Sequence, residues 1–121
     1  MKQEEKQLLL VDLSARLPYK IKFNIDSSDV ITSFPRILEE INSNGWITCE
    51  DMYLEIEDVK PYLFPLSSMT KEQLLELASI SFENSIDSSI KTLDWLNKNH
   101  FDYRNLIDKN LAIDCTNLNI Y

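Results

Sequence analysis

Glycine is almost missing from this chain, which has one glycine, Gly45, among its 121 residues. Phosphate-binding loops and dinucleotide-binding turns need several glycines at fixed spacing, because their backbone must approach the phosphates closely. The sequence therefore excludes both kinds of nucleotide site. With 44% apolar residues, the low glycine content also indicates an ordered core rather than a flexible linker or a disordered segment.

Residues that bind metals or act as nucleophile and base are equally few. The chain has two cysteines, Cys49 and Cys115, and one histidine, His100. The thiols form no CxxC pair and no calcium-loop pattern is present, so we predict no metal site and no cofactor. No activated nucleophile can be placed beside His100, so we predict no catalytic residue. We expect both thiols to be free and buried, in the reducing cytoplasm.

Positive charge is in deficit along the whole chain, whose formal net charge is -8. The first 60 residues carry seven basic and twelve acidic side chains, and the remainder carries five and eight. Such a spread negative charge repels phosphate backbones and anionic membranes, so we expect neither a nucleic-acid nor a membrane partner. The longest N-terminal apolar run, Leu8 to Val11, is too short for a signal peptide or a membrane span.

The first half of the chain has the periodicities of one helix followed by a small sheet. Apolar residues at helical spacing predict a helix over 2–17, ended by Pro18. Alternation from Tyr19 to Ile25 predicts a half-buried strand, and the alternation of Met52, Leu54 and Ile56 predicts another whose acidic face, with Glu55 and Glu57, meets water.

Residues 35–43 admit two interpretations. Pro35 followed by Ile37, Leu38 and Ile41 is typical of a short helix. Asn44-Gly45, however, is a strong hairpin signal, and it would pair Arg36–Ile41 with Trp46–Cys49. The balance favours the sheet, but both interpretations stay open.

The second half is predicted to be helical after a proline-containing connector, residues 59–69, which we expect to lie extended against the core. Thr70 and Gln73 form a capping-box pattern at the start of one helix. Ser85 or Asp87 is placed to cap a second helix, and Asp102 a short third one through Ile107. The first helix has one apolar face, and the second has an apolar stripe with Trp95 beside it. The face consists of Leu74, Leu77, Ala78 and Phe82, and the stripe of Ile86, Ile90, Leu93 and Leu96.

These elements together predict a single α+β domain, residues 1–121. It has an N-terminal helix, a small antiparallel β-sheet or partly closed barrel, and then two longer helices and one short helix. The helix and sheet part is 1–58, the connector 59–69 and the helical part 70–121. The apolar tail, Leu111 to Tyr121, is expected to dock on the core.

Two groups of residues are candidate sites. His100, Asp102 and Arg104 place an imidazole, a carboxylate and a guanidinium within five residues, which could bind a small ligand. The same residues could instead form a structural joint, in which His100 closes one helix and Asp102 caps the next, and we favour the joint. Tyr62 and Phe64 could contact a partner, although aromatics between prolines more often close a core.

Three stretches give the chain a resemblance to a family. They are Ala15-Arg16-Leu17-Pro18-Tyr19, then VKPYLFPLSSMT from Val59 to Thr70, then NHFDYRNLIDKNLAIDCTNLNIY from Asn99 to Tyr121. The chain resembles a family of small proteins carried by gut Bacteroidales and their phages and prophages. The resemblance implies a phage or mobile-element setting, and it brings no activity, cofactor or catalytic residue to this chain.

The resulting hypothesis is a non-catalytic accessory protein, derived from a phage or mobile element, that binds a viral or bacterial protein. The alternative is a small enzyme, or a protein that binds a nucleotide or other small ligand, with His100, Asp102 and Arg104 in its site. Both classes remain open at this point, because composition and spacing identify neither a partner nor a ligand.

Overall fold

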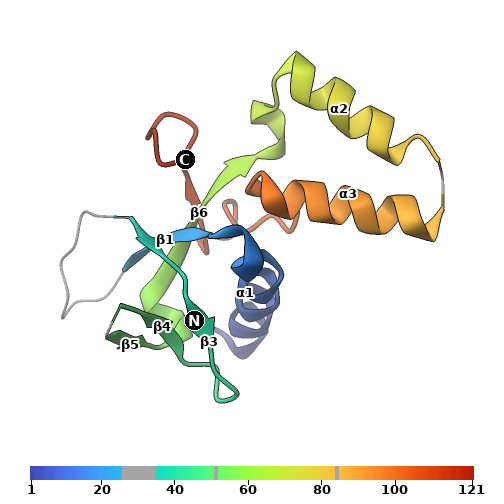
Figure 1. Ribbon diagram of the computed structural model, residues 1–121. Coiled ribbons are helices and arrows are strands. Elements are labelled where there is room, and N and C mark those ends of the chain that lie inside the picture. The colour runs from blue at the N-terminus through green and yellow to red at the C-terminus, as the bar shows by residue number, and fades with distance from the viewer. Residues whose placement is uncertain (26–34, 51, 84) are drawn as a thin grey trace.

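The computed structural model describes residues 1–25, 35–50, 52–83 and 85–121, which form two small sheets and three α-helices (Figure 1). The class is α+β, as predicted, and the sheets do not close into a barrel. No helix in the described ranges is both long and apolar enough to cross a membrane.

The N-terminal helix α1 spans Gln3–Arg16, close to its predicted bounds. Leu9 and Leu13, one helical turn apart, are completely or almost completely buried. Beyond Arg16 the chain tightens into a 3-10 turn over Leu17–Tyr19 and then reverses at Lys20, which has a left-handed φ of 56°. Pro18 cannot continue an α-helix, so the predicted end of α1 is confirmed.

The larger sheet is mixed and joins segments from the whole length of the chain. Its strand order is β2–β1–β6–β7, and β8 also pairs with β6. The strands are β1 Lys22–Ile25, β2 Arg36–Ile37, β6 Val59–Pro65, β7 Phe101–Asp102 and β8 Ile113–Asp114. β1 runs antiparallel to β6, whereas β7 and β8 run parallel to it. The predicted strand over Tyr19 to Ile25 is therefore present but shorter.

Residues 59–65, predicted to be part of an extended connector, form the strand β6 instead. Val59–Pro65 is the longest strand of the fold and lies at the centre of its sheet. A proline has no N–H for a ladder, but here Pro61 is the last residue that pairs with β1, and Pro65 is the last residue of the strand. The two prolines thus stand where a missing donor costs least, and Leu63 between them is completely buried.

The smaller sheet is an antiparallel meander of β3 Glu40–Ile41, β4 Ile47–Cys49 and β5 Met52–Leu54. Its β3–β4 turn contains Asn44-Gly45, with φ of 81° at Gly45, and pairs Ile41 with Ile47. The sheet interpretation of residues 35–43 is thus confirmed, although Arg36–Ile37 pairs with β1 rather than with β4.

The second predicted strand of this region ends earlier than expected. β5 stops at Leu54, and a 3-10 turn follows over Ile56–Asp58. Glu55 and Glu57 therefore do not form the face of a strand. Glu57 pairs instead with Lys6 of α1, and this hydrogen bond lowers the pKa of the Glu57 carboxyl.

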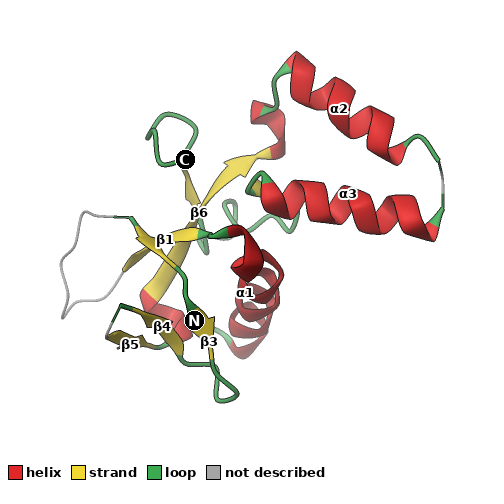
Figure 2. Cartoon of the chain, in the orientation of Figure 1, coloured by secondary structure: helices red, strands yellow, loops and turns green. Residues whose placement is uncertain are grey.

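The helices α2 Lys71–Ser81 and α3 Ile86–Lys98 form a hairpin, shown in red on the right of Figure 2. Thr70 Oγ1 accepts a hydrogen bond from Gln73 N at 3.1 Å, and Gln73 Oε1 accepts one from Thr70 N at 2.9 Å. This is the predicted capping box. Ser85, one of the two predicted caps, begins α3 by accepting from Ser88 N at 3.1 Å.

The predicted third helix is absent. Asp102 ends β7, and the residues after it form turns rather than a helix. The cap chemistry is nevertheless present, because Asp102 Oδ1 accepts from Leu106 N at 3.0 Å and Oδ2 accepts from Ile107 N at 2.9 Å. The chain then reverses through left-handed residues at Asn105 and Asn110 before it enters β8, so no helical turn is propagated.

The main core lies among α1, the two sheets and the tail. Its buried side chains are Leu9, Leu13, Ile21, Phe23, Ile25, Leu38, Ile47, Cys49, Leu54, Val59, Leu63, Leu106, Leu111 and Ala112. The tail docks as predicted, since Cys115 is buried and its N–H donates to Leu63 O at 3.0 Å. Both cysteines are free and buried, as expected, and burial raises the pKa of the Cys115 thiol to about 11.

Candidate functional site

The α2–α3 hairpin extends away from the two sheets, with its helices side by side (Figure 1). α2 contains no buried residue, so the apolar face predicted for it is not covered by the rest of the chain. Leu74 is 53% exposed and Phe82 is 86% exposed. The face stays uncovered because α2 packs mainly against α3, through Leu77 and Ile80.

The apolar stripe of α3 is covered only in part. Leu96 and Trp95 are buried and lie near the end of α3 that meets the body of the protein. Ile86, at the other end, is 83% exposed, and Ile90 is 55% exposed. The stripe thus passes from covered to uncovered along the helix.

Each helix of the hairpin therefore has two apolar sides. At 100° per residue, Ala78 and Phe82 lie about 100° or more around α2 from Leu77 and Ile80, whereas Leu74 lies between the two sets, about 60° from Leu77. Ile86, Ile90 and Leu93 fall on one side of α3, away from Trp95. We call the exposed set the outer residues; they are Leu74, Leu75, Phe82, Ile86, Ile90 and Leu93.

The inner sides of the hairpin form a second, smaller core. Trp95, Leu96 and Phe101 are its buried members, and Leu77, Ile80 and Met69 pack against them. The rings of Trp95 and Phe101 are stacked, with centroids 5.6 Å apart and an interplanar angle of 8°. Because Phe101 belongs to β7, this stack attaches the hairpin to the larger sheet.

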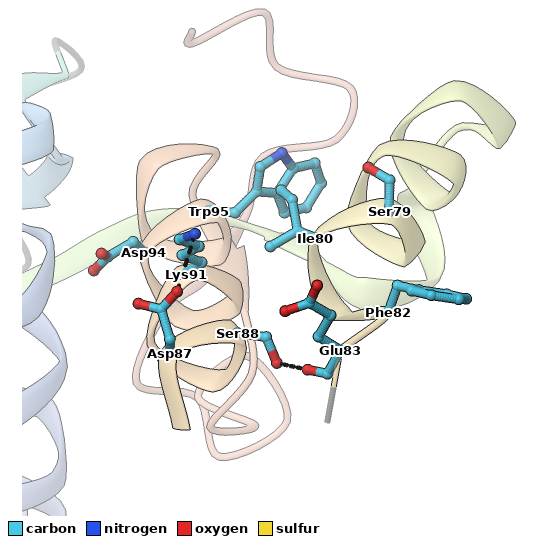
Figure 3. Close-up of a pocket in the computed structure, with 9 residues that line it drawn as sticks. All are labelled: Ser79, Ile80, Phe82, Glu83, Asp87, Ser88, Lys91, Asp94 and Trp95. Carbon is cyan, nitrogen blue, oxygen red and sulfur yellow. Dashed lines mark hydrogen bonds and ion pairs between the residues drawn. The ribbon is translucent and has the colours of Figure 1, made fainter. Parts of the chain in front are cut away.

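A cleft of about 510 Å³ lies between the two helices (Figure 3). Its apolar lining includes Ile80 and Trp95, which point toward each other, whereas Phe82 points away from α3. Its charged lining consists of Glu83, Asp87, Lys91 and Asp94. Ser88 is also at the cleft, and it donates to the backbone oxygen of Glu83, which fixes the start of α3 against the end of α2.

A buried polar network connects α1 to the segment after α3. Asp12 and Arg16 are both completely buried. Arg16 Nε donates to Asp12 Oδ2 at 2.8 Å, and Arg16 Nη2 donates to the backbone oxygen of Phe101 at 2.6 Å. Arg104 approaches the same carboxylate, with its Nε 3.4 Å from Asp12 Oδ1. The Tyr103 ring lies against both guanidinium groups, at 5.2 Å from Arg16 and 4.8 Å from Arg104.

His100 is buried, follows α3 and has a left-handed φ of 62°. Its ring is stacked on Tyr121 with centroids 3.8 Å apart, and its backbone oxygen accepts from Phe64 N at 2.8 Å. Burial, together with the positive charges of Arg16 and Lys22, lowers the pKa of His100 to about 4. His100 is thus a neutral ring at neutral pH, and it does not act as a charged helix cap.

The three residues of the predicted ligand site therefore have separate surroundings. Asp102 is buried and directs its oxygens to backbone N–H groups of its own turn, and His100 packs on Tyr121. Arg104 packs on Tyr103 and faces Asp12. Asp102 makes the cap contacts expected of the joint, but with a turn rather than a helix, and His100 does not cap α3 with a charged ring. The joint and the ligand-binding alternative both stay predictions.

The two predicted partner-contacting aromatics, Tyr62 and Phe64, both lie in β6 of the larger sheet. Tyr62 is buried, and burial raises the pKa of its hydroxyl. Phe64 is half-buried, with its ring 5.9 Å from those of Phe101 and Tyr121. Their role in partner binding is still a prediction, but Tyr62 offers little surface for it.

The outer residues are the feature that sequence reasoning missed. The signal was present, because Leu74 and Leu75 are adjacent and therefore cannot both lie on one narrow buried stripe of an 11-residue helix. Comparison of the chain with protein-family models, curated proteins and solved structures gives no match.

Proposed function

We propose that this protein is a non-catalytic accessory protein of the cytoplasm, from a phage or mobile element, and that it binds another protein through the outer residues of the α2–α3 hairpin. The observation that carries the proposal is the exposure of apolar side chains on both helices of one projecting unit. The setting rests on the resemblance of the three sequence stretches.

The clustering of these side chains supports an interface. Of the fourteen large apolar side chains that are exposed among the described residues, six lie between positions 74 and 93. Exposed apolar residues scattered singly are normal on any protein surface, whereas six of them on one pair of helices favour an interaction site. A helix that is apolar on two sides is typical of one that is covered on both sides.

The gain from covering this surface is of the same order as the cost of association. Complete burial of one Leu, Ile or Phe side chain contributes roughly 1.5 to 3 kcal/mol. Association costs about 4 to 15 kcal/mol in lost translational and rotational freedom, so several of the outer residues must be buried together. Two adjacent helices supply such a set, in the manner of a helix face that docks into a groove.

The test is affinity capture of a partner from extracts of gut Bacteroidales cells, identified by mass spectrometry. The double variant Ile86→Ser/Ile90→Ser should lose the partner that the unmodified protein captures. Its fold should persist, because both side chains already meet water, at 83% and 55% exposure.

The matched control is Val11→Ser/Tyr53→Ser, which changes two apolar residues outside the hairpin at 53% and 71% exposure. The control should capture the partner as well as the unmodified protein does. Equal capture by the hairpin variant, or loss of capture with the control alone, would contradict the proposal.

A further inference from the structure

The cleft between α2 and α3 has both apolar and acidic lining residues. In Figure 3, Ile80, Trp95 and Glu83 lie between the two helices, whereas Asp87 and Asp94 project on the other side of α3. Ile80 comes from α2 and Trp95 from α3, and both belong to the smaller core. The apolar lining is therefore held by packing that is present before any partner binds. A preformed apolar cleft with a few placed polar groups is the usual form of a binding site.

The charges of the cleft are unequal. Three carboxylates, on Glu83, Asp87 and Asp94, face one ammonium, on Lys91. Lys91 Nζ lies 3.0 Å from Asp87 Oδ2, which neutralises one of the three. Within the described part of the chain, Glu83 and Asp94 make no ion pair. The carboxylates of Glu83 and Asp94 can therefore interact with positive charges on a bound partner.

We infer that this cleft receives a basic amphipathic helix of the partner protein, with an apolar side chain over Ile80 and Trp95 and cationic side chains beside Glu83 and Asp94. The inference rests on the proposed function and adds the chemistry of the part of the partner that enters the cleft; the outer residues of α3 lie on the other side of that helix and would contact another part of the partner. An apolar anchor alone would leave both carboxylates facing an apolar surface, whereas Lys or Arg beside them gives charge complementarity.

The charge of the whole molecule supports the same partner. The net charge of -8 attracts a basic segment over the range of the screened field and speeds its encounter with the protein. A second copy of this chain is a poorer occupant. Residues 71–98 carry five carboxylates and three lysines, so two hairpins would meet with charges of the same sign.

The test uses the fluorescence of Trp95 in the full chain. The chain has two tryptophans, and Trp46→Phe leaves Trp95, on the cleft, as the only one. The probe is a synthetic helical peptide of about 15 residues, made only of Leu and Lys at helical spacing, long enough to span α2. The comparison peptide has Glu in place of every Lys. The Lys peptide should change Trp95 emission saturably and more weakly as salt rises, and the Glu peptide should not.

The site of binding is tested by two variants with the same change of charge. Glu83→Gln/Asp94→Asn removes the two cleft carboxylates that make no ion pair, and should weaken binding of the Lys peptide about fivefold to tenfold. Glu72→Gln/Glu76→Gln removes two carboxylates of α2 that do not line the cleft. This control should weaken binding less than twofold.

Equal weakening by both variants, equal binding of the Glu peptide, or no saturable change of emission would overturn the inference. A dimer in light scattering that occupies the cleft and excludes the Lys peptide would overturn it in favour of a second copy. These failures are distinct from failure of the proposed function. If capture depends on Ile86 and Ile90 but not on Glu83 and Asp94, the proposed interface stands and only the basic partner helix is excluded.

Discussion

Arg16 is the most unusual side chain of the core, since a completely buried guanidinium must be neutralised and hydrogen-bonded where it lies. Asp12 supplies the charge from one helical turn earlier, and the backbone of Phe101 supplies a further acceptor. A buried ion pair adds little net stability, because both groups lose their water. The ion pair instead fixes the position of α1, because the hydrogen bond from Arg16 to the backbone of Phe101 holds α1 against β7 and the base of the hairpin.

His100 makes stability depend on pH. Its pKa of about 4 in the folded protein lies below the usual 6.5, so between these values the unfolded chain binds more protons. The neutral His100 ring therefore contributes stability that is fully present above about pH 6.5, and this contribution is lost as the pH falls toward about 4. The groups that face the ring are Arg16, Lys22 and Tyr121, and both basic groups disfavour its protonation.

We expect His100→Asn to flatten this dependence, because Asn tolerates the left-handed backbone and carries no titrating group. Between about pH 7 and about pH 4 the unmodified protein should lose roughly 1 to 3 kcal/mol more of its unfolding free energy than the variant does. Urea unfolding at both pH values measures the difference. Equal losses in the two proteins would exclude His100 as the source.

At the scale of elements, α2 combines a complete capping box with no buried residue. Thr70 caps α2, whose side chains are all at least partly exposed. Thr70→Ala should cost about 1 kcal/mol of α2 stability, and Thr70→Ser less. Hydrogen exchange of the α2 amides is the appropriate measurement, because a loosely packed helix opens locally, and the Ala variant should exchange roughly fivefold faster. Unchanged exchange in the Ala variant would mean that the Thr70 hydroxyl does not hold the start of α2.

Sequence patterns predicted those elements whose signals are local. The Thr70 capping box, the Ser85 cap, the Asn44-Gly45 turn and the end of α1 at Pro18 each involve contacts within a few residues. Such signals do not depend on the rest of the fold. The capping contacts of Asp102 are local in the same way, although they close a turn and not the helix that was expected after it.

The rest of the fold depended on contacts between distant residues. β6 was taken for a connector because two prolines usually exclude a central strand, and only its pairing with β1, β7 and β8 makes Val59–Pro65 one. The burial of Arg16 requires contacts with both Asp12 and Phe101. No local sequence pattern predicts a contact with a residue as distant as Phe101. The apolar faces of α2 and α3 were correctly identified. Periodicity, however, cannot show whether such a face is buried by the same chain or by another protein.

At the scale of the whole molecule, the fold divides its apolar surface between two uses. α1, the sheets and the tail enclose one core, and the inner sides of α2 and α3 enclose another. The outer residues stay uncovered on the part of the chain that projects farthest from the sheets (Figure 1). In our account the body holds the hairpin in place, and the hairpin makes the contact with the partner.

The most direct test of this account is hydrogen exchange of the protein, alone and in complex with the partner that it captures. Binding should slow exchange in peptides from α2 and α3, while the β3–β4–β5 sheet, on another part of the fold, should exchange at the same rate in both states. Protection confined to that smaller sheet, with none in α2 and α3, would contradict the hairpin as the binding surface.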